Sequence, residues 1–259
     1  MKKVIKIKRA NCPQSLNKAY NAFRKNDYSN NNVKETLLIM QHRKCCYCEV
    51  ELDKSGPLTK EVEHYIPKSA DDFKDASGNT QWHLANSWTN LLFSCRNCNG
   101  KKSNQHPFDQ CTGERRLIDP TCEDIDPEEH IDFILDEDFM MHNVRGKTPL
   151  GQTTSEMLQF AIRSDLFGGF LKVSLKIEGY IGELIIALIN GNNVKCNAMK
   201  KDLRRMMSAH CEFAAFRRAF ISKKIKRLNE EIIPKLEAEY NNAFDRITID
   251  IPQGAEVVE

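Results

Sequence analysis

The chain has 259 residues, 41% of them hydrophobic, and its formal net charge at pH 7 is +2. This length allows one large domain or two smaller ones with apolar cores, and so weak a net charge argues little about partners. The strongest candidate for a membrane span, 167–189, contains four charged side chains. We therefore expect a buried helical segment there and no membrane association.

The first half of the chain has short apolar patterns separated by polar residues. We expect helices over 16–25, 33–42 and 98–104, and strands over 59–66 and 90–94. Between the two strands the chain is polar and rich in turn residues, which indicates a long inserted loop.

The second half is predicted to be mostly helical. Asp126-Pro127 is typical of a helix start, and 131–141 fits either a strand or a hairpin. A stripe of apolar residues at helical spacing predicts an amphipathic helix that Pro234 should kink or end. The stripe consists of Ile225, Leu228, Ile232, Leu236, Tyr240 and Phe244.

These elements predict an α+β chain made of five consecutive segments. They are a helical N-terminal lead (1–43), a metal-binding core (44–110), an acidic connector (111–145), a helical C-terminal region (146–247) and a tail (248–259) that is disordered or an edge strand. Lys and Arg are concentrated in 1–60 and 195–227, which fits either a surface that faces a polyanion or an ordinary solvated face.

Two Cys-x-x-Cys motifs give the strongest metal signal in the sequence. Cys45 and Cys48, with Cys95 and Cys98, can supply four thiolates to one structural zinc. Residues 1–8 lack the apolar core of a secretory signal, so we expect reduced thiols and a cytoplasmic location. Cys46 could compete for the metal, but adjacent cysteines rarely bind one zinc together, so Cys45 is favoured.

A Glu-His pair, Glu63-His64, lies between the two cysteine motifs. Cleavage of a phosphodiester needs a base that activates water and a cation that neutralises charge on the phosphate and the leaving group. A neutral histidine suits the first task, and a carboxylate is a good ligand for a hard cation. Neighbouring residues of a strand point to opposite faces, but a bend near Pro67 would let both reach one site.

Two asparagines complete the candidate site. Asn90 is assigned to hold the second ring nitrogen of His64, because a histidine base works in one tautomer. Asn99 follows a predicted zinc ligand, so the zinc would fix its position and its amide oxygen could bind the cation. Among the basic residues nearby, Arg96, Lys101 and Lys102 are candidates for phosphate contacts. Lys68 fits a phosphate contact and a solvated lysine equally well.

Residues 45–108 resemble an HNH endonuclease of the McrA-like, zinc-stabilised kind, with a ββα-metal core and a zinc knuckle of four cysteines. The resemblance rests on the acid-His pair and on Asn90 and Asn99, nine positions apart. It implies that His64 is the general base, that Asn90 orients it, and that Glu63 and Asn99 hold magnesium or manganese. Its implied products carry a 5′-phosphate and a 3′-hydroxyl.

A longer string of motifs over about 1–145 resembles the PtuB family of nuclease subunits from bacterial Septu antiphage systems. It comprises Cys-Tyr-Cys-Glu, Glu-His-x-Ile-Pro-Lys, Trp-x-Asn-Leu, Ser-Cys-x-x-Cys-Asn-x-x-Lys and Leu-Ile-Asp-Pro. The resemblance implies an SMC-like ATPase partner of the PtuA type and, beside some retrons, a reverse transcriptase with its msDNA. We expect the C-terminal helices to dock such a partner.

The main alternative is a noncatalytic zinc knuckle that binds nucleic acid or scaffolds an ATPase, which would not need Glu63, His64 and Asn99 together. Whether the target is DNA or RNA stays open, because no motif reads base edges. The run 145–148, Arg-Gly-Lys-Thr, lacks the first glycine of a phosphate-binding loop, so we reject ATP-type nucleotide binding by this chain and expect any ATP dependence to belong to a partner. The histidines other than His64 are interpreted as structural.

Overall fold

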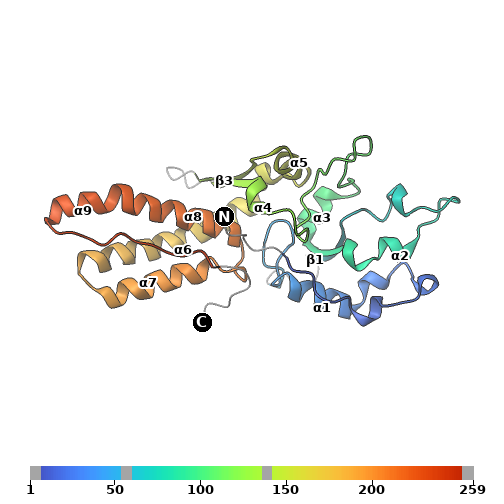
Figure 1. The fold of residues 1–259 in the computed structure, drawn as a ribbon, viewed down its shortest axis with the longest axis horizontal. Coiled ribbons are helices and arrows are strands. Elements are labelled where there is room, and N and C mark those ends of the chain that lie inside the picture. Colours follow the sequence, from blue (N-terminus) through green and yellow to red (C-terminus); the bar gives the residue numbers. More distant parts are fainter. Residues whose placement is uncertain (1–6, 54–59, 136–141, 253–259) are drawn as a thin grey trace. The chain divides into compact units, whose positions relative to one another are not determined.

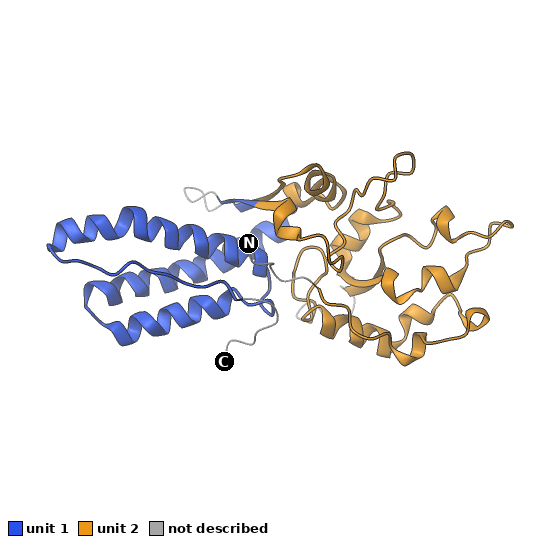
Figure 2. Cartoon of the chain, in the orientation of Figure 1, with its two compact units in different colours: residues 1–5, 133–143, 163–259 blue, residues 6–132, 144–162 orange. Residues whose placement is uncertain are grey.

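The computed structural model describes residues 7–53, 60–135 and 142–252 (Figure 1). It divides into two compact units, coloured separately in Figure 2. Among the described residues, the sheet unit comprises 7–53, 60–132 and 144–162, and the helical unit comprises 133–135, 142–143 and 163–252. The predicted α+β class is confirmed, since two small antiparallel sheets accompany a mostly helical chain. Within the described ranges, no helix combines the length and apolarity needed to cross a membrane.

The predicted helix over 16–25 is wrong, because this segment contains only short 3-10 turns. They are η1 (Gln14–Leu16), η2 (Tyr20–Ala22) and, just beyond, η3 (Asp27–Ser29). The carboxylate of Asp27 accepts hydrogen bonds from the Arg24 backbone N–H and from Lys18. Such side-chain bonds compete with helical backbone bonds and favour turns.

Helix α1 (Asn31–Met40) confirms the second predicted helix. Asn30 caps it by accepting a hydrogen bond from the backbone N–H of Asn32. The helix buries Val33 and Leu37, and the next residue, Gln41, ties it to the sheet. The Gln41 side-chain amide exchanges two hydrogen bonds with the backbone of Phe93, at 2.7 and 2.8 Å. The backbone N–H and carbonyl of Phe93, at a buried edge of the strand, thus have hydrogen-bond partners without a third strand.

The sheet unit is centred on strands β1 (Lys60–His64) and β2 (Leu91–Cys95), which confirm the predicted strands within the described residues. They pair antiparallel, with His64 opposite Leu91 and Lys60 opposite Cys95. Helix α3 (Arg96–Lys102) follows β2 directly and packs against both strands. The order of the elements is therefore strand, strand, helix.

The loop between β1 and β2 contains local structure that the sequence did not predict. Its short elements are η5 (Asp71–Phe73), α2 (Trp82–Ala85) and η6 (Trp88–Asn90).

Beyond the sheet, α4 (Pro127–His130) begins at the predicted Asp-Pro start. Strand β3 (Ile131–Leu135) is the one strand in the described part of the predicted range 131–141, whose remainder, 136–141, lies outside the described residues. Its partner, β4 (His142–Gly146), begins just beyond that range. Helix α5 (Pro149–Met157) and η7 (Phe160–Ile162) complete the sheet unit.

The helical unit is built on α6 (Ser164–Ile189), α7 (Asn193–Met206), α8 (Ala214–Arg227) and α9 (Ile233–Tyr240). Its core is aromatic. The ring of Phe216 stacks on Phe170 and Phe220, with centroids 4.4 and 5.7 Å apart. Stacked and edge-on aromatic pairs stabilise a core beyond the area they bury.

Pro234 does not end its helix. A π-helical turn over Leu228–Ile232 precedes it, so α8, this turn and α9 run on without a break. A π turn accommodates a proline that cannot donate a backbone hydrogen bond. The wider turn also shifts the buried face by one residue, since Ile233 is buried and Ile232 only half-buried. Over the described part of the tail, up to residue 252, no strand forms.

Candidate functional site

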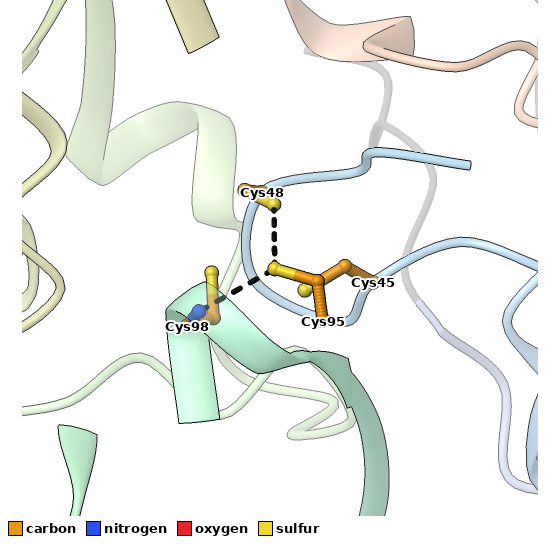
Figure 3. A group of neighbouring side chains, drawn as sticks. All are labelled: Cys45, Cys48, Cys95 and Cys98. Carbon is orange, nitrogen blue, oxygen red and sulfur yellow. Dashed lines mark hydrogen bonds between the residues drawn. The ribbon is translucent and has the colours of Figure 1, made fainter. Parts of the chain in front are cut away.

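Four cysteine side chains converge at the junction of β2 and α3 (Figure 3). Cys45 and Cys48 lie on the turn after α1, Cys95 ends β2, and Cys98 lies in the first turn of α3. All four sulfur atoms lie within 4.8 Å of one another, and those of Cys48 and Cys95 are 3.7 Å apart. Tetrahedral zinc with Zn–S bonds of about 2.3 Å requires a separation of about 3.8 Å.

The chemistry of this cluster fits a structural zinc. All four side chains are buried, and four thiolates packed this closely repel one another unless a bound cation compensates their charge. Four sulfur ligands leave no open position for substrate. Cys46 lies outside the cluster, and its backbone N–H bonds to the Phe93 carbonyl. The group of four sulfurs contains Cys45 and not Cys46, which supports Cys45 as the predicted ligand.

Glu63 is buried in an ion pair. Its carboxylate lies 2.8 Å from the ammonium of Lys102, and the two side chains are 2% and 1% exposed. The Tyr47 hydroxyl donates a long hydrogen bond of 3.5 Å to the same carboxylate. Burial raises the pKa of Glu63 to about 7, against the opposing effect of Lys102. Lys102 also donates to the backbone carbonyl of His64 at 2.9 Å, so it is a structural cation of the sheet.

Asn99 lies one helical turn before Lys102 on the side of α3 that faces β1. Its amide nitrogen donates to the carboxylate of Glu61. Glu61 and Glu63 share one face of β1, because side chains alternate along a strand. The structure thus brings the two predicted cation ligands, Glu63 and Asn99, to the same β1–α3 interface. Glu61 was missed by the sequence analysis, although its position two residues before Glu63 would have indicated it.

His64 ends β1 and is held by a residue that the sequence analysis did not select. Its Nε2 lies 3.2 Å from the side-chain oxygen of Asn86, and the Tyr28 ring packs edge-on against the imidazole at 4.8 Å. Its side chain makes none of its described hydrogen bonds with Glu63 or Asn99. His64 is 6% exposed, and burial lowers its pKa to about 4. The ring is therefore neutral at pH 7.

The contacts of Asn86 define the tautomer of His64. The Asn86 amide nitrogen donates to the Arg24 backbone carbonyl at 2.9 Å, so its oxygen faces the imidazole. An amide oxygen only accepts hydrogen bonds, and hence Nε2 of His64 carries the proton. Nδ1 is then the basic nitrogen of the ring.

Asn90 makes a different set of contacts from the one expected. Its side chain accepts from the Ile66 backbone N–H at 2.8 Å and donates to the carbonyls of Ile66 and Ala85, both at 3.0 Å. It fixes the bend that follows His64 rather than the imidazole itself. The amide that the sequence analysis sought for the ring is supplied by Asn86, four positions earlier.

The basic candidates divide into exposed and engaged side chains. Arg96 and Lys101 are exposed on α3. Lys68 lies 4.5 Å above the Tyr28 ring and donates to its hydroxyl, so it belongs to the cover over His64. Lys102 is buried in its pair with Glu63.

The chain is similar to two curated proteins named Septu protein PtuB. It is 36% identical to the one from Bacillus mycoides (strain KBAB4) over 120 residues, which are 41% of this chain and 40% of the relative. It is 31% identical to the one from Bacillus thuringiensis over 162 residues, 60% of this chain and 54% of the relative. The closeness to PtuB that the motifs predicted is thereby confirmed.

These similarities cover only part of each protein, since the chain spans 40% and 54% of the length of the relatives it matches. No family model matches the chain, and no solved structure matches it.

Removal of one cluster thiol should release the metal. We expect purified protein to contain roughly one zinc per chain and Cys98→Ala to lose it, because three thiolates bind zinc more weakly. Elemental analysis by plasma mass spectrometry measures the content. Cys46→Ala removes a buried thiol beside the cluster and should keep its zinc; equal loss in both variants would contradict this ligand set.

The Asn86 contact predicts one imidazole tautomer. At pH 7.5, nitrogen-15 NMR of His64 should show protonated Nε2 and unprotonated Nδ1 in the native protein. Asn86→Ala removes the acceptor, so the two nitrogen shifts should move toward each other as the second tautomer becomes populated. His83→Ala simplifies the spectrum and serves as the control. Unchanged shifts in Asn86→Ala would show that another group sets the tautomer.

Proposed function

We propose that this protein is a metal-dependent HNH endonuclease that hydrolyses phosphodiester bonds in nucleic acid. The observation that carries the proposal is the shared β1–α3 interface, where Glu63 and Asn99 lie beside the strand end that holds His64. The cysteine cluster lies at the base of the same helix. A strand, a strand and a helix in this order match the ββα-metal core implied by the sequence resemblance.

Each group has a definite role in this proposal. Glu63 and Asn99 bind magnesium or manganese through oxygen, the donor that hard cations prefer. The cation stabilises charge on the phosphate and on the leaving oxygen. Nδ1 of His64 takes a proton from the attacking water. The side-chain N–H of Asn99 donates to the carboxylate of Glu61. The amide oxygen of Asn99 therefore points away from that carboxylate and is available to a cation.

The described arrangement is a closed form of this site. Lys102 occupies the carboxylate of Glu63, and the Tyr28 ring packs edge-on against the imidazole of His64. A cation at Glu63 would have to displace the Lys102 ammonium, and water would have to reach Nδ1. We propose that activation opens both contacts, which agrees with a nuclease that would harm its own cell if it were constantly active.

The two PtuB relatives place a Septu antiphage role first among the biological possibilities. We propose that the chain is the effector of a defence complex with an SMC-like ATPase of the PtuA type. In retron-associated systems the complex would include a reverse transcriptase and its msDNA.

The helical unit is the proposed docking region for the ATPase partner. Along α6, the apolar side chains of Leu171, Leu175 and Ile186 are 38%, 57% and 50% exposed. Their spacing places them on one side of the helix, opposite the buried Ile177 and Leu184. An exposed apolar stripe of this kind is typical of a protein interface.

Replacement of the proposed base should abolish cleavage. With its partner present, and with plasmid and tRNA as substrates in magnesium, His64→Ala should lower the cleavage rate by roughly 10²- to 10⁴-fold. Zinc content and circular dichroism should remain unchanged. His210→Ala, an exposed histidine of the helical unit, is the control. Undiminished cleavage by His64→Ala would favour the alternative of a noncatalytic zinc knuckle.

Charges on the α6 stripe should prevent assembly. In co-expression with an SMC-like ATPase of the PtuA type, the full chain carrying Leu175→Glu and Ile186→Glu should lose co-purification, because an interface would have to bury two carboxylates. Val194→Glu, at an 83% exposed apolar position on α7, should retain it. Normal recovery of the partner by the double variant would locate the interface elsewhere.

A further inference from the structure

A cavity of about 440 Å³ lies in the sheet unit, outside the groups assigned to cleavage. Its lining comes from three segments: 109–116, His130, and the beginning of α5. A volume of this size is within the range of small-ligand sites. All of its lining belongs to the same compact unit as β1, β2 and α3.

Two glycines bring the walls of this cavity together. A β-carbon on Gly151 would lie 1.9 Å from the carbonyl oxygen of His130, and one on Gly146 would lie 2.1 Å from the backbone nitrogen of Gln152. Glycine is therefore required where β4, α4 and α5 meet. The Arg-Gly-Lys-Thr run at 145–148, rejected as a phosphate-binding loop, thus forms this close crossing. Thr148 caps α5 and bonds to Nδ1 of His130 at 2.7 Å.

Two neighbouring guanidinium groups, Arg115 and Arg116, line the cavity together with the carboxylates of Asp109 and Glu114. Arg115 is fixed on an aromatic base, 4.9 Å from the Phe108 ring centroid and 5.9 Å from that of Tyr65. Its Nη1 donates to the Tyr65 hydroxyl at 2.9 Å. Arg116 is exposed, and within the described residues neither guanidinium forms an ion pair with a carboxylate. Such arginines are well suited to bind phosphate.

The remaining lining suits a nucleobase. Pro149 and Leu150 provide an apolar wall, and Glu114 contributes a carboxylate at the same cavity. A carboxylate accepts hydrogen bonds from the exocyclic amino groups of bases but repels phosphate. The arginines can therefore bind a phosphate, and the apolar wall with a carboxylate can bind a base, which together are the chemical pattern of a single nucleotide.

We propose that this cavity binds one nucleotide of a single-stranded polynucleotide substrate, with its phosphate on Arg115 and Arg116. The inference rests on the proposed nuclease function and adds a substrate class to it. Arg115 bonds to Tyr65, the residue that follows His64, which links one wall of the cavity to the segment that carries the proposed base. The cavity fixes the strand without reading a long sequence, since phosphate contacts carry little base information.

Binding can be measured separately from cleavage in a His64→Ala background. Fluorescence anisotropy with labelled 12-nucleotide DNA and RNA strands, without magnesium, gives the affinity at several salt concentrations. Arg116→Glu should weaken binding of at least one strand by roughly tenfold and lower the slope of log affinity against log salt by about one. Leu150→Trp, which fills the cavity, should weaken the same strand. Arg205→Glu, in the helical unit, should leave its affinity unchanged.

The outcomes separate the two proposals. Equal affinities for all variants would overturn the cavity as a substrate site, even if the native protein cleaves nucleic acid. Arg116-dependent binding of free AMP, with strand binding unaffected, would also overturn it in favour of a free nucleotide. Conversely, the protein could bind strands through the cavity and yet cleave no nucleic acid. That result would contradict the proposed nuclease function and still support the cavity as a binding site.

Discussion

The cysteine cluster is the constraint on which the rest of the site depends. It joins the turn after α1 to the end of β2 and the start of α3, so the direction of α3 relative to the sheet is fixed by four sulfur atoms. Asn99 follows one of them directly, and Lys102 lies one turn further on. Metal binding of this kind couples the fold to the ion, which means that the β1–α3 interface should be lost with the zinc.

In our proposal, the Glu63–Lys102 ion pair is the contact of the β1–α3 interface that changes on activation. Removal of one partner from a buried ion pair typically costs about 3–5 kcal/mol, because the other charge remains uncompensated. A divalent cation could replace the ammonium as the partner of Glu63, provided that Lys102 finds another anion. A substrate phosphate is such an anion, so cation and nucleic acid would favour the same rearrangement.

Local patterns in the sequence predicted those parts of the fold that local chemistry determines. The cysteine spacing identified the cluster and the choice of Cys45 over Cys46, and strand and helix signals located β1, β2 and α3. The failure at 16–25 has a local cause too, since Asp27 bonds to a backbone group that a helix would use. By contrast, Asn86 acts through contacts that depend on folding, and no spacing in the sequence reveals which amide reaches a given ring.

The long loop between β1 and β2 supplies the asparagines that hold the end of β1. It is longer than the connection of a hairpin, and Asn86 is the C-cap of its short helix α2. Asn86 then bridges Nε2 of His64 and the carbonyl of Arg24, while Asn90 closes the bend at Ile66. The loop thus returns two amides to the end of β1, one for the ring and one for the backbone. A shorter connection could join the strands, but it would leave the imidazole without the acceptor that fixes its basic nitrogen.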